Sequence, residues 1–181
     1  MKYGSWLKKK LTTEEINNKF LLDTDNMGRT SWHLAVGEGN VQLLLKIWEW
    51  AEENLTTEEK NNKLLLGTDS MGKTAWHLAV GESNVQLLRK KWEWGEENLT
   101  TEEVNNKLLL GTDITGRTAW HLAAENNNGE VLHKIWEWAE ETLTTEEIYN
   151  ILLLGTDNMG KTARHLAMYW GKLEILRTVW D

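Results

Sequence analysis

The sequence DSMGKTAWHLAVGESNVQLLRKKW, residues 69–92, belongs to a frame that returns along this chain at one fixed spacing. Its opening Asp-x-x-Gly-x-Thr and the histidine that follows recur every 44 residues, without insertions. A constant period of this size is typical of stacked repeats, in which each unit buries its apolar face against its neighbours. The repeats therefore predict one array rather than separate domains.

Each unit is predicted to begin with a turn and two helices. In the unit 25–68, Asp25 and Gly28 indicate the turn, because Asp accepts hydrogen bonds from its own backbone and Gly tolerates positive φ. Thr30 is placed to cap a first helix over residues 31–38. A second helix is predicted over residues 41–54.

A third helix is predicted over residues 55–66. Thr56 stands three residues before Glu59, which is the spacing of a capping box, and acidic residues favour a helix N-terminus. The predicted fold class is therefore all-α, with a turn plus three helices per repeat. Within one array over residues 1–181, we expect a partial unit at 1–24, full repeats at 25–68, 69–112 and 113–156, and a truncated unit at 157–181.

Two tryptophans stand two residues apart in each predicted second helix, as Trp48 and Trp50 do. Positions two apart on a helix point about 200° away from each other, so the two rings cannot share a face. We therefore expect the second helix to be sandwiched, with one stripe against the stack and the other covered by the third helix. Asparagine pairs such as Asn61-Asn62 leave two alternatives open, a ladder between third helices or a plain exposed face.

The repeated motif resembles an ankyrin repeat. Asp69, Gly72, Thr74, His77 and Ala79 fall on that family's pattern Asp-x-x-Gly-x-Thr-Pro-Leu-His-x-Ala-Ala. The resemblance covers nearly the whole chain and implies an ankyrin-like helical repeat solenoid. Ankyrin repeats run about 33 residues, so the longer period here implies an inserted third helix. A three-helix armadillo-like or HEAT-like repeat also fits the period, but it does not account for the turn followed by histidine.

Several positions depart from the repeated pattern. Asn127 replaces the glycine expected at the end of a first helix, and asparagine is the next-best residue for left-handed geometry. Lys91 occupies a position that holds Ile47 and Ile135 in other units, which predicts poorer packing in the middle unit. Arg164 replaces the repeated tryptophan, which suggests a polar cap on the last unit.

Composition argues against several classes of protein. Lys plus Arg is 20 and Asp plus Glu is 28, and a net charge of −8 does not favour nucleic-acid binding. The chain has no Cys, no signal-peptide pattern and no apolar run of about 18 residues. We therefore expect no membrane span and favour a cytoplasmic location. A monomer is also expected.

Neither catalysis nor metal binding is expected from the repeated polar residues. The histidines His33, His77, His121 and His165 lie one unit apart, too far for one ion to bridge them. The resemblance to ankyrin repeats implies instead that each histidine hydrogen-bonds the threonine three residues before it. The glutamate clusters occupy helix ends and caps, and the chain shows no pattern of a catalytic triad or phosphate loop. We predict no enzyme and no cofactor.

The resemblance to ankyrin repeats implies partner binding through the turn tips and the concave face of the first helices, to which the helix exits add further positions. At the tips, these positions are Asn26, Met27 and Arg29; Ser70, Met71 and Lys73; Ile114, Thr115 and Arg117; and Asn158, Met159 and Lys161. At the helix exits they are Glu38, Glu82, Asn126, Tyr169 and Trp170.

Two rows of residues stand out among these tips. Arg29, Lys73, Arg117 and Lys161 would form a basic row along one edge of an acidic protein. Met27, Met71 and Met159 would add a soft apolar row, and methionine suits adaptable interfaces. The first hypothesis is a protein–protein interaction scaffold with a partner of unknown identity. The alternative is a structural spacer or an engineered or trimmed repeat scaffold without a specific ligand.

Overall fold

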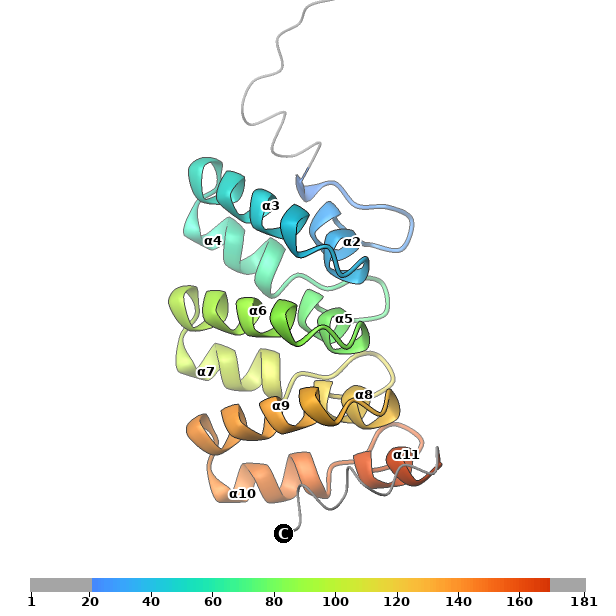
Figure 1. The fold of residues 1–181 in the computed structure, drawn as a ribbon. Helices are drawn as coiled ribbons and strands as arrows, with labels where there is room; N and C mark the ends of the chain where they lie inside the picture. The colour runs from blue at the N-terminus through green and yellow to red at the C-terminus, as the bar shows by residue number, and fades with distance from the viewer. Residues whose placement is uncertain (1–20, 170–181) are drawn as a thin grey trace, which may run out of the picture.

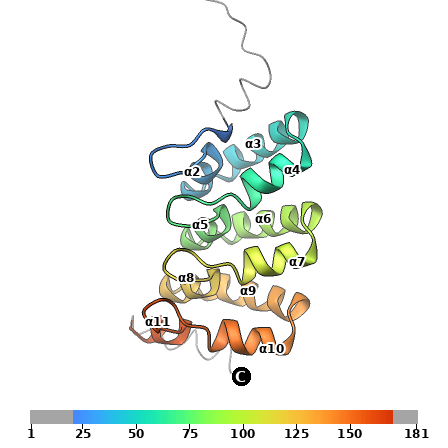
Figure 2. The same cartoon turned by 180° about the vertical axis from the view of Figure 1, so that it is seen from behind.

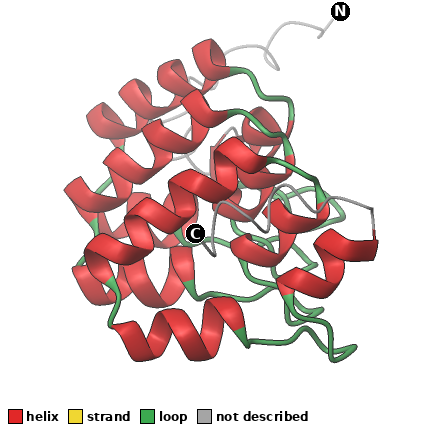
Figure 3. Ribbon diagram, turned by 60° about the horizontal axis from the view of Figure 1, so that its bottom comes forward, coloured by secondary structure: helices red, strands yellow, loops and turns green. Residues whose placement is uncertain are grey.

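A computed structural model of the chain describes residues 21–169, with only the backbone described at Tyr169. Within this range the chain is mostly helical and contains no β-strand, which confirms the predicted all-α class (Figure 3). The first helices of the units are α2 (Ser31–Gly37), α5 (Ala75–Gly81), α8 (Ala119–Glu125) and α11 (Ala163–Tyr169). The second helices are α3 (Val41–Asn54), α6 (Val85–Asn98) and α9 (Gly129–Thr142).

The third helical segments each combine one α-helical turn with a π-helix. They are α4 (Thr57–Glu59) with η2 (Lys60–Leu65), α7 (Thr101–Glu103) with η3 (Val104–Leu109), and α10 (Thr145–Glu147) with η4 (Ile148–Leu153). No helix within residues 21–169 has both the length and the apolar character needed to cross a membrane.

The helices are arranged in two columns (Figures 1 and 2). The first helices α2, α5, α8 and α11 lie one below the next, and each packs against its neighbours in this column. The second and third helices alternate in the other column, where α6 packs against η2 and α9 against η3. One hydrophobic core of buried residues extends through both columns.

The first helix of each unit begins where the sequence predicts. The Thr30 hydroxyl accepts a hydrogen bond from the backbone N–H of His33, and the Thr30 backbone N–H lies 3.3 Å from His33 Nδ1. The second ring nitrogen, Nε2, lies 3.0 Å from the carbonyl oxygen of Gly67 in the connection to the next unit. A carbonyl only accepts, so Nε2 carries the proton and Nδ1 accepts from Thr30. The predicted Thr–His pairing is confirmed, and His33, His77 and His121 also bond the connection that leads out of their own unit into the next one.

The reversal between first and second helices requires a left-handed residue. Gly39, Ser83 and Asn127 fill this position with φ near +60°. The expectation for Asn127 is confirmed, whereas Ser83 was not foreseen because serine has no special preference for this geometry. Asn40 then caps α3, since its side-chain oxygen accepts a hydrogen bond from the Leu43 N–H at 3.0 Å.

The winding of the third helix differs from the prediction. The capping box is confirmed, because Glu59 accepts from the Thr56 N–H at 2.9 Å while the Thr56 hydroxyl accepts from the Glu59 N–H. Beyond this turn the bonds reach five residues back, as from the Leu66 N–H to the Asn61 carbonyl at 2.8 Å. A π-helix is rare and has no sequence signature of its own.

The second residue after each π-helix is a glycine, because the backbone of the preceding turn approaches it closely. A Cβ placed on Gly67 would lie 2.5 Å from the carbonyl oxygen of Lys63. Gly111 and Gly155 meet the equivalent carbonyls of Lys107 and Ile151.

The tryptophans form clusters of three rings that join consecutive units. Trp94 stacks on Trp48 of the preceding unit with 4.6 Å between ring centroids, and it also contacts Trp32 at 5.5 Å. Trp138 stacks on Trp92 in the same way, also at 4.6 Å. The two tryptophans of one second helix therefore point toward opposite neighbours. We predicted that the third helix covers the second buried face of each second helix. In the structure, tryptophans of the adjacent unit provide much of this cover.

Lys91 lies at the interface between the first two full units and is 1% exposed. Its Nζ has no hydrogen-bond partner and lies 4.8 Å from the centroid of the Trp32 ring. Burial lowers the pKa of Lys91 to about 7. The side chain fills the place that Ile135 fills in the next unit, and Ile135 is also buried.

Candidate interaction surface

In each predicted turn tip, the side chain of the first aspartate accepts hydrogen bonds from backbone N–H groups of the same turn. Asp69 Oδ1 accepts from the backbone N–H groups of Met71, at 2.8 Å, and Lys73, at 2.9 Å. The Asp69 N–H donates to the Lys73 carbonyl at 2.9 Å, which closes a tight loop. The same bonds recur at Asp25, Asp113 and Asp157. The conformation of the tips is therefore set by local chemistry.

Successive tips are joined by backbone hydrogen bonds. The Ser70 N–H donates to the Met27 carbonyl at 2.8 Å, and the Ile114 N–H donates to the Met71 carbonyl at 3.0 Å. Gly28 stands at this contact, where a Cβ would lie 2.9 Å from the Ser70 nitrogen. We call the joined tips the turn ribbon; it comprises residues 25–29, 69–73, 113–117 and 157–161.

The turn ribbon carries exposed apolar side chains. Met27 is 48% exposed, Met71 39%, Ile114 57% and Met159 73%. Large apolar residues that are this exposed and recur along one edge are typical of interaction sites. The polar tip residues Asn26, Ser70, Thr115 and Asn158 are exposed beside them.

The basic row is partly buried, and the charges of its two arginines are paired within the chain. Arg29 pairs with Asp25 at 2.7 Å, and this contact holds the pKa of Asp25 below its usual value. Arg117 pairs with Glu125 at 2.7 Å and with Asp157 at 3.3 Å. Lys73 and Lys161 are partly buried in the same register. The turn ribbon therefore does not present a row of four uncompensated positive charges.

The predicted positions at the helix exits lie apart from the turn ribbon. Glu38, Glu82 and Asn126 are exposed at the C-terminal ends of α2, α5 and α8. A seven-residue helix separates each of them from its turn by about 10 Å. Trp170 and the side chain of Tyr169 lie outside the described residues.

Sequence reasoning did not single out an apolar surface around η4. Tyr149 is 56% exposed, Leu154 52% and Met168 49%. The available signal was Tyr149 itself, which stands where the earlier units have Asn61 and Asn105.

The described residues hold no group of three or more His, Asp or Glu side chains that could bind a metal ion. No protein-family model matches this chain, and no curated protein matches it either.

Proposed function

We propose that this chain is an ankyrin-like helical repeat solenoid that binds a protein partner through its turn ribbon and the adjoining face of the first helices. The column of first helices and the Asp-x-x-Gly-x-Thr turns support this assignment. The histidine bond also fits a stacked array, since it fixes the connection through which each unit leads into the following one.

One observation carries the proposal: the exposed Met27, Met71, Ile114 and Met159 lie on tips that backbone hydrogen bonds join together. A rigid surface loses little conformational freedom on binding, so more of the contact energy appears as affinity. The thioether side chains can still adapt to the shape of a partner. Because Arg29 and Arg117 are already paired, we expect recognition to be mainly apolar.

The alternative is a structural spacer without a specific ligand. The internal pairing of Arg29 with Asp25 and of Arg117 with Glu125 favours it, because these charges are satisfied without a partner.

The proposal is tested by capturing partners from a broad lysate with a photo-crosslinking residue at position 71. The test variant has Ser in place of Met27, Met71, Ile114 and Met159, and it carries the crosslinking residue at position 70. This variant should no longer capture the protein. The matched control changes Leu43 to Ser, because this residue is similarly exposed but lies on the second helix α3, away from the turn ribbon and the first helices. It should keep the protein. Circular dichroism would establish that all forms are folded.

Capture that survives the Ser substitutions would move the site away from the turn ribbon. Absence of any captured protein above background would favour the spacer.

A further inference from the structure

One of two successive interfaces in the array buries an amine. We call the contact between the units 25–68 and 69–112 the first interface, and the contact between 69–112 and 113–156 the second interface. Lys91 lies at the first interface, where it is 1% exposed. In the part of the chain that the structure describes, its Nζ has no hydrogen-bond partner. At the same position of the second interface, Ile135 is fully buried. Only the first interface therefore has an ionisable group at this position.

Lys91 shares a helix face with the ring that joins the two units. Lys91 and Trp94 are three residues apart on α6, so their side chains lie on the same face. Lys91 Nζ is 4.8 Å from the centroid of the Trp32 ring, and Trp94 contacts the same ring at 5.5 Å. Trp94 also stacks on Trp48. The amine therefore lies beside the three-ring cluster of the first interface.

Charged groups near Lys91 do not offset a charge on its amine. Burial lowers the pKa of Lys91 to about 7 and is the only cause of this shift. The charged side chains of α3 and the other charged side chains of α6 are exposed. On η2, Lys63 is exposed and Lys60 lies over the Trp48 ring at 5.6 Å, which adds a second cation to the cluster.

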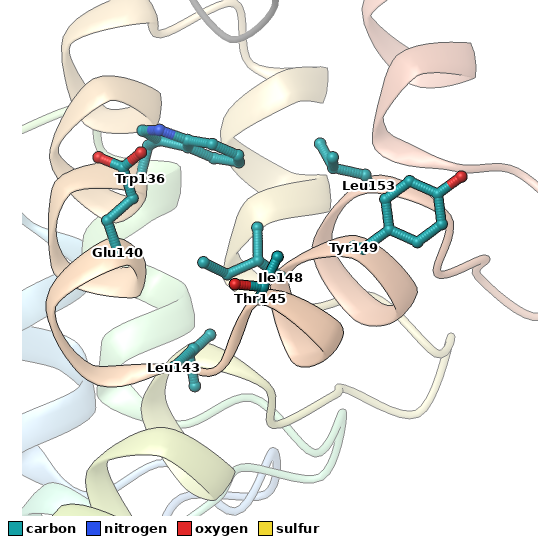
Figure 4. A pocket seen from close by; sticks show the side chains of 7 residues that line it. All are labelled: Trp136, Glu140, Leu143, Thr145, Ile148, Tyr149 and Leu153. Carbon is teal, nitrogen blue, oxygen red and sulfur yellow. The ribbon is translucent and has the colours of Figure 1, made fainter.

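The ionisable groups of α5 and α9, which also pack against α6, have other surroundings. His77 is the one ionisable side chain of α5, and it bonds the connection to the following unit. On α9, Glu137 pairs with Lys134. Glu140 lines a hollow beside Trp136, on the side of α9 that faces η4 (Figure 4). The other charged residues of α9 are exposed.

His33 is the one ionisable side chain of α2, and it responds to the charge of Lys91. Burial lowers the pKa of His33 most, and the charge of Lys91 lowers it further, whereas Asp69 and Asp25 raise it. His33 Nδ1 lies 3.3 Å from the Thr30 backbone nitrogen, whose N–H donates to it. A proton on Nδ1 would place two donors against each other, so protonation of His33 breaks this bond.

We propose that the first interface is a pH-sensitive joint, which opens on acidification as Lys91 and His33 bind protons. In a stacked array each unit contacts only its neighbours, so a charge buried at one interface weakens that interface and not the next. Opening returns the ammonium group to water and separates the stacked rings, whose faces become exposed. The joint does not depend on partner binding by the turn ribbon.

The pH range of the opening follows from these two groups. The pKa of Lys91 falls from 10.5 to about 7 on burial, so between these values the open joint binds a proton that the closed joint lacks. As pH falls through this range, the ratio of closed to open joint drops by up to about tenfold per pH unit. Burial also lowers the pKa of His33 below 6.5, so a second loss follows at lower pH.

Thiol labelling can measure each interface separately, because the chain contains no Cys. Leu87 lies one turn before Lys91 on the same face of α6, and Val131 takes the same position on α9. Both side chains are fully buried. Leu87→Cys reports the first interface, and Val131→Cys is the matched control for the second. At low maleimide concentration the labelling rate follows the open population. Dividing it by the rate for the urea-unfolded chain at the same pH removes the titration of the thiol.

Lowering the pH from 9 to 7 should raise the normalised labelling of Leu87→Cys by roughly fiftyfold. Val131→Cys should change by less than about threefold, because its interface buries Ile135 instead of an amine. Adding Lys91→Ile to Leu87→Cys should remove the dependence on pH. Adding Lys90→Ile should preserve it, because Lys90 is exposed and paired with Glu93. Circular dichroism would establish that each variant is folded, and Lys91→Met replaces Lys91→Ile if the latter is not.

NMR titration of the His33 ring, assigned with His33→Gln, tests the second group. The pKa of His33 should rise in Lys91→Ile, because the positive charge near it is removed.

Each measurement has an outcome that would overturn the proposal. An equal dependence on pH at positions 87 and 131 would mean that the whole array unfolds and no single interface opens. A dependence at position 87 that survives Lys91→Ile would mean that another group drives the opening. An unchanged pKa of His33 in Lys91→Ile would mean that the two groups do not act together.

Discussion

Replacing Lys91 should stabilise the protein substantially. Its ammonium group is removed from water, and within residues 21–169 it has no hydrogen-bond partner and its one compensating contact is the ring of Trp32. Its charge also lowers the pKa of the nearby His33, whose pKa is already lowered chiefly by burial. The next unit shows that a buried aliphatic side chain, Ile135, fits the same position.

The expected magnitude follows from the pKa of Lys91. Burial lowers it from 10.5 to about 7, which corresponds to about 5 kcal/mol at about 1.4 kcal/mol per unit of pKa. The face of Trp32 returns about 0.5–2 kcal/mol to the protonated amine through a cation–π contact. We therefore expect Lys91→Met to raise the free energy of unfolding by roughly 3 kcal/mol at pH 6.5.

The pH dependence of this gain has a definite sign. Below pH 7 the amine is protonated in both states, so the folded parent bears the full penalty. Between pH 7 and pH 10.5 the unfolded chain binds a proton that the folded chain lacks, so the stability of the parent rises with pH. The advantage of Lys91→Met should therefore shrink toward zero as pH approaches 10.5.

The assay is urea denaturation followed by circular dichroism at pH 6.5 and pH 10. Lys90→Met is the matched control, because Lys90 is the adjacent residue and its side chain is 46% exposed. It should change stability by less than about 0.5 kcal/mol at either pH, as is usual for surface substitutions. A Lys91→Met variant that is no more stable than the parent, or whose advantage is the same at both pH values, would refute the account of a buried amine.

Two further predictions concern single backbone positions. Ser83→Gly should raise the free energy of unfolding by about 1 kcal/mol in urea denaturation, because Ser83 has a φ of 59° and the equivalent position in α2–α3 is Gly39; no gain would argue against strain at this reversal. Gly67→Ala should lower the melting temperature, with a loss of more than about 1 kcal/mol, because its Cβ would lie 2.5 Å from the Lys63 carbonyl. Gly37→Ala, whose Cβ would have no neighbour within 4 Å, is the control and should not destabilise.

Local chemistry made much of the fold predictable. Thr30 caps the first helix and Thr56 the third, as their spacing to His33 and Glu59 indicated. The second helix covers residues 41–54, as predicted. These features depend on residues within four positions of one another, so the sequence contains all the partners that they need.

The candidate site was predictable only in part. Exposure of the tips follows from their turn chemistry, and Met27, Met71 and Met159 are indeed exposed. The basic residues in the sequence did not predict the net charge that the turn ribbon presents. Arg117 forms an ion pair with Asp157, which lies forty residues later in the chain.

The sequence by itself determined the period, the turns and the caps, because each relies on hydrogen bonds between near neighbours. The tertiary structure alone decided the π-helical winding of the third segments, the unpaired amine of Lys91 and the three-ring tryptophan clusters. Trp48 and Trp94 meet because α3 and α6 lie in successive layers, and within residues 21–169 no third ring joins Trp120 and Trp136. These outcomes depend on which surfaces the stack brings together and excludes from water, and no spacing within one unit specifies that.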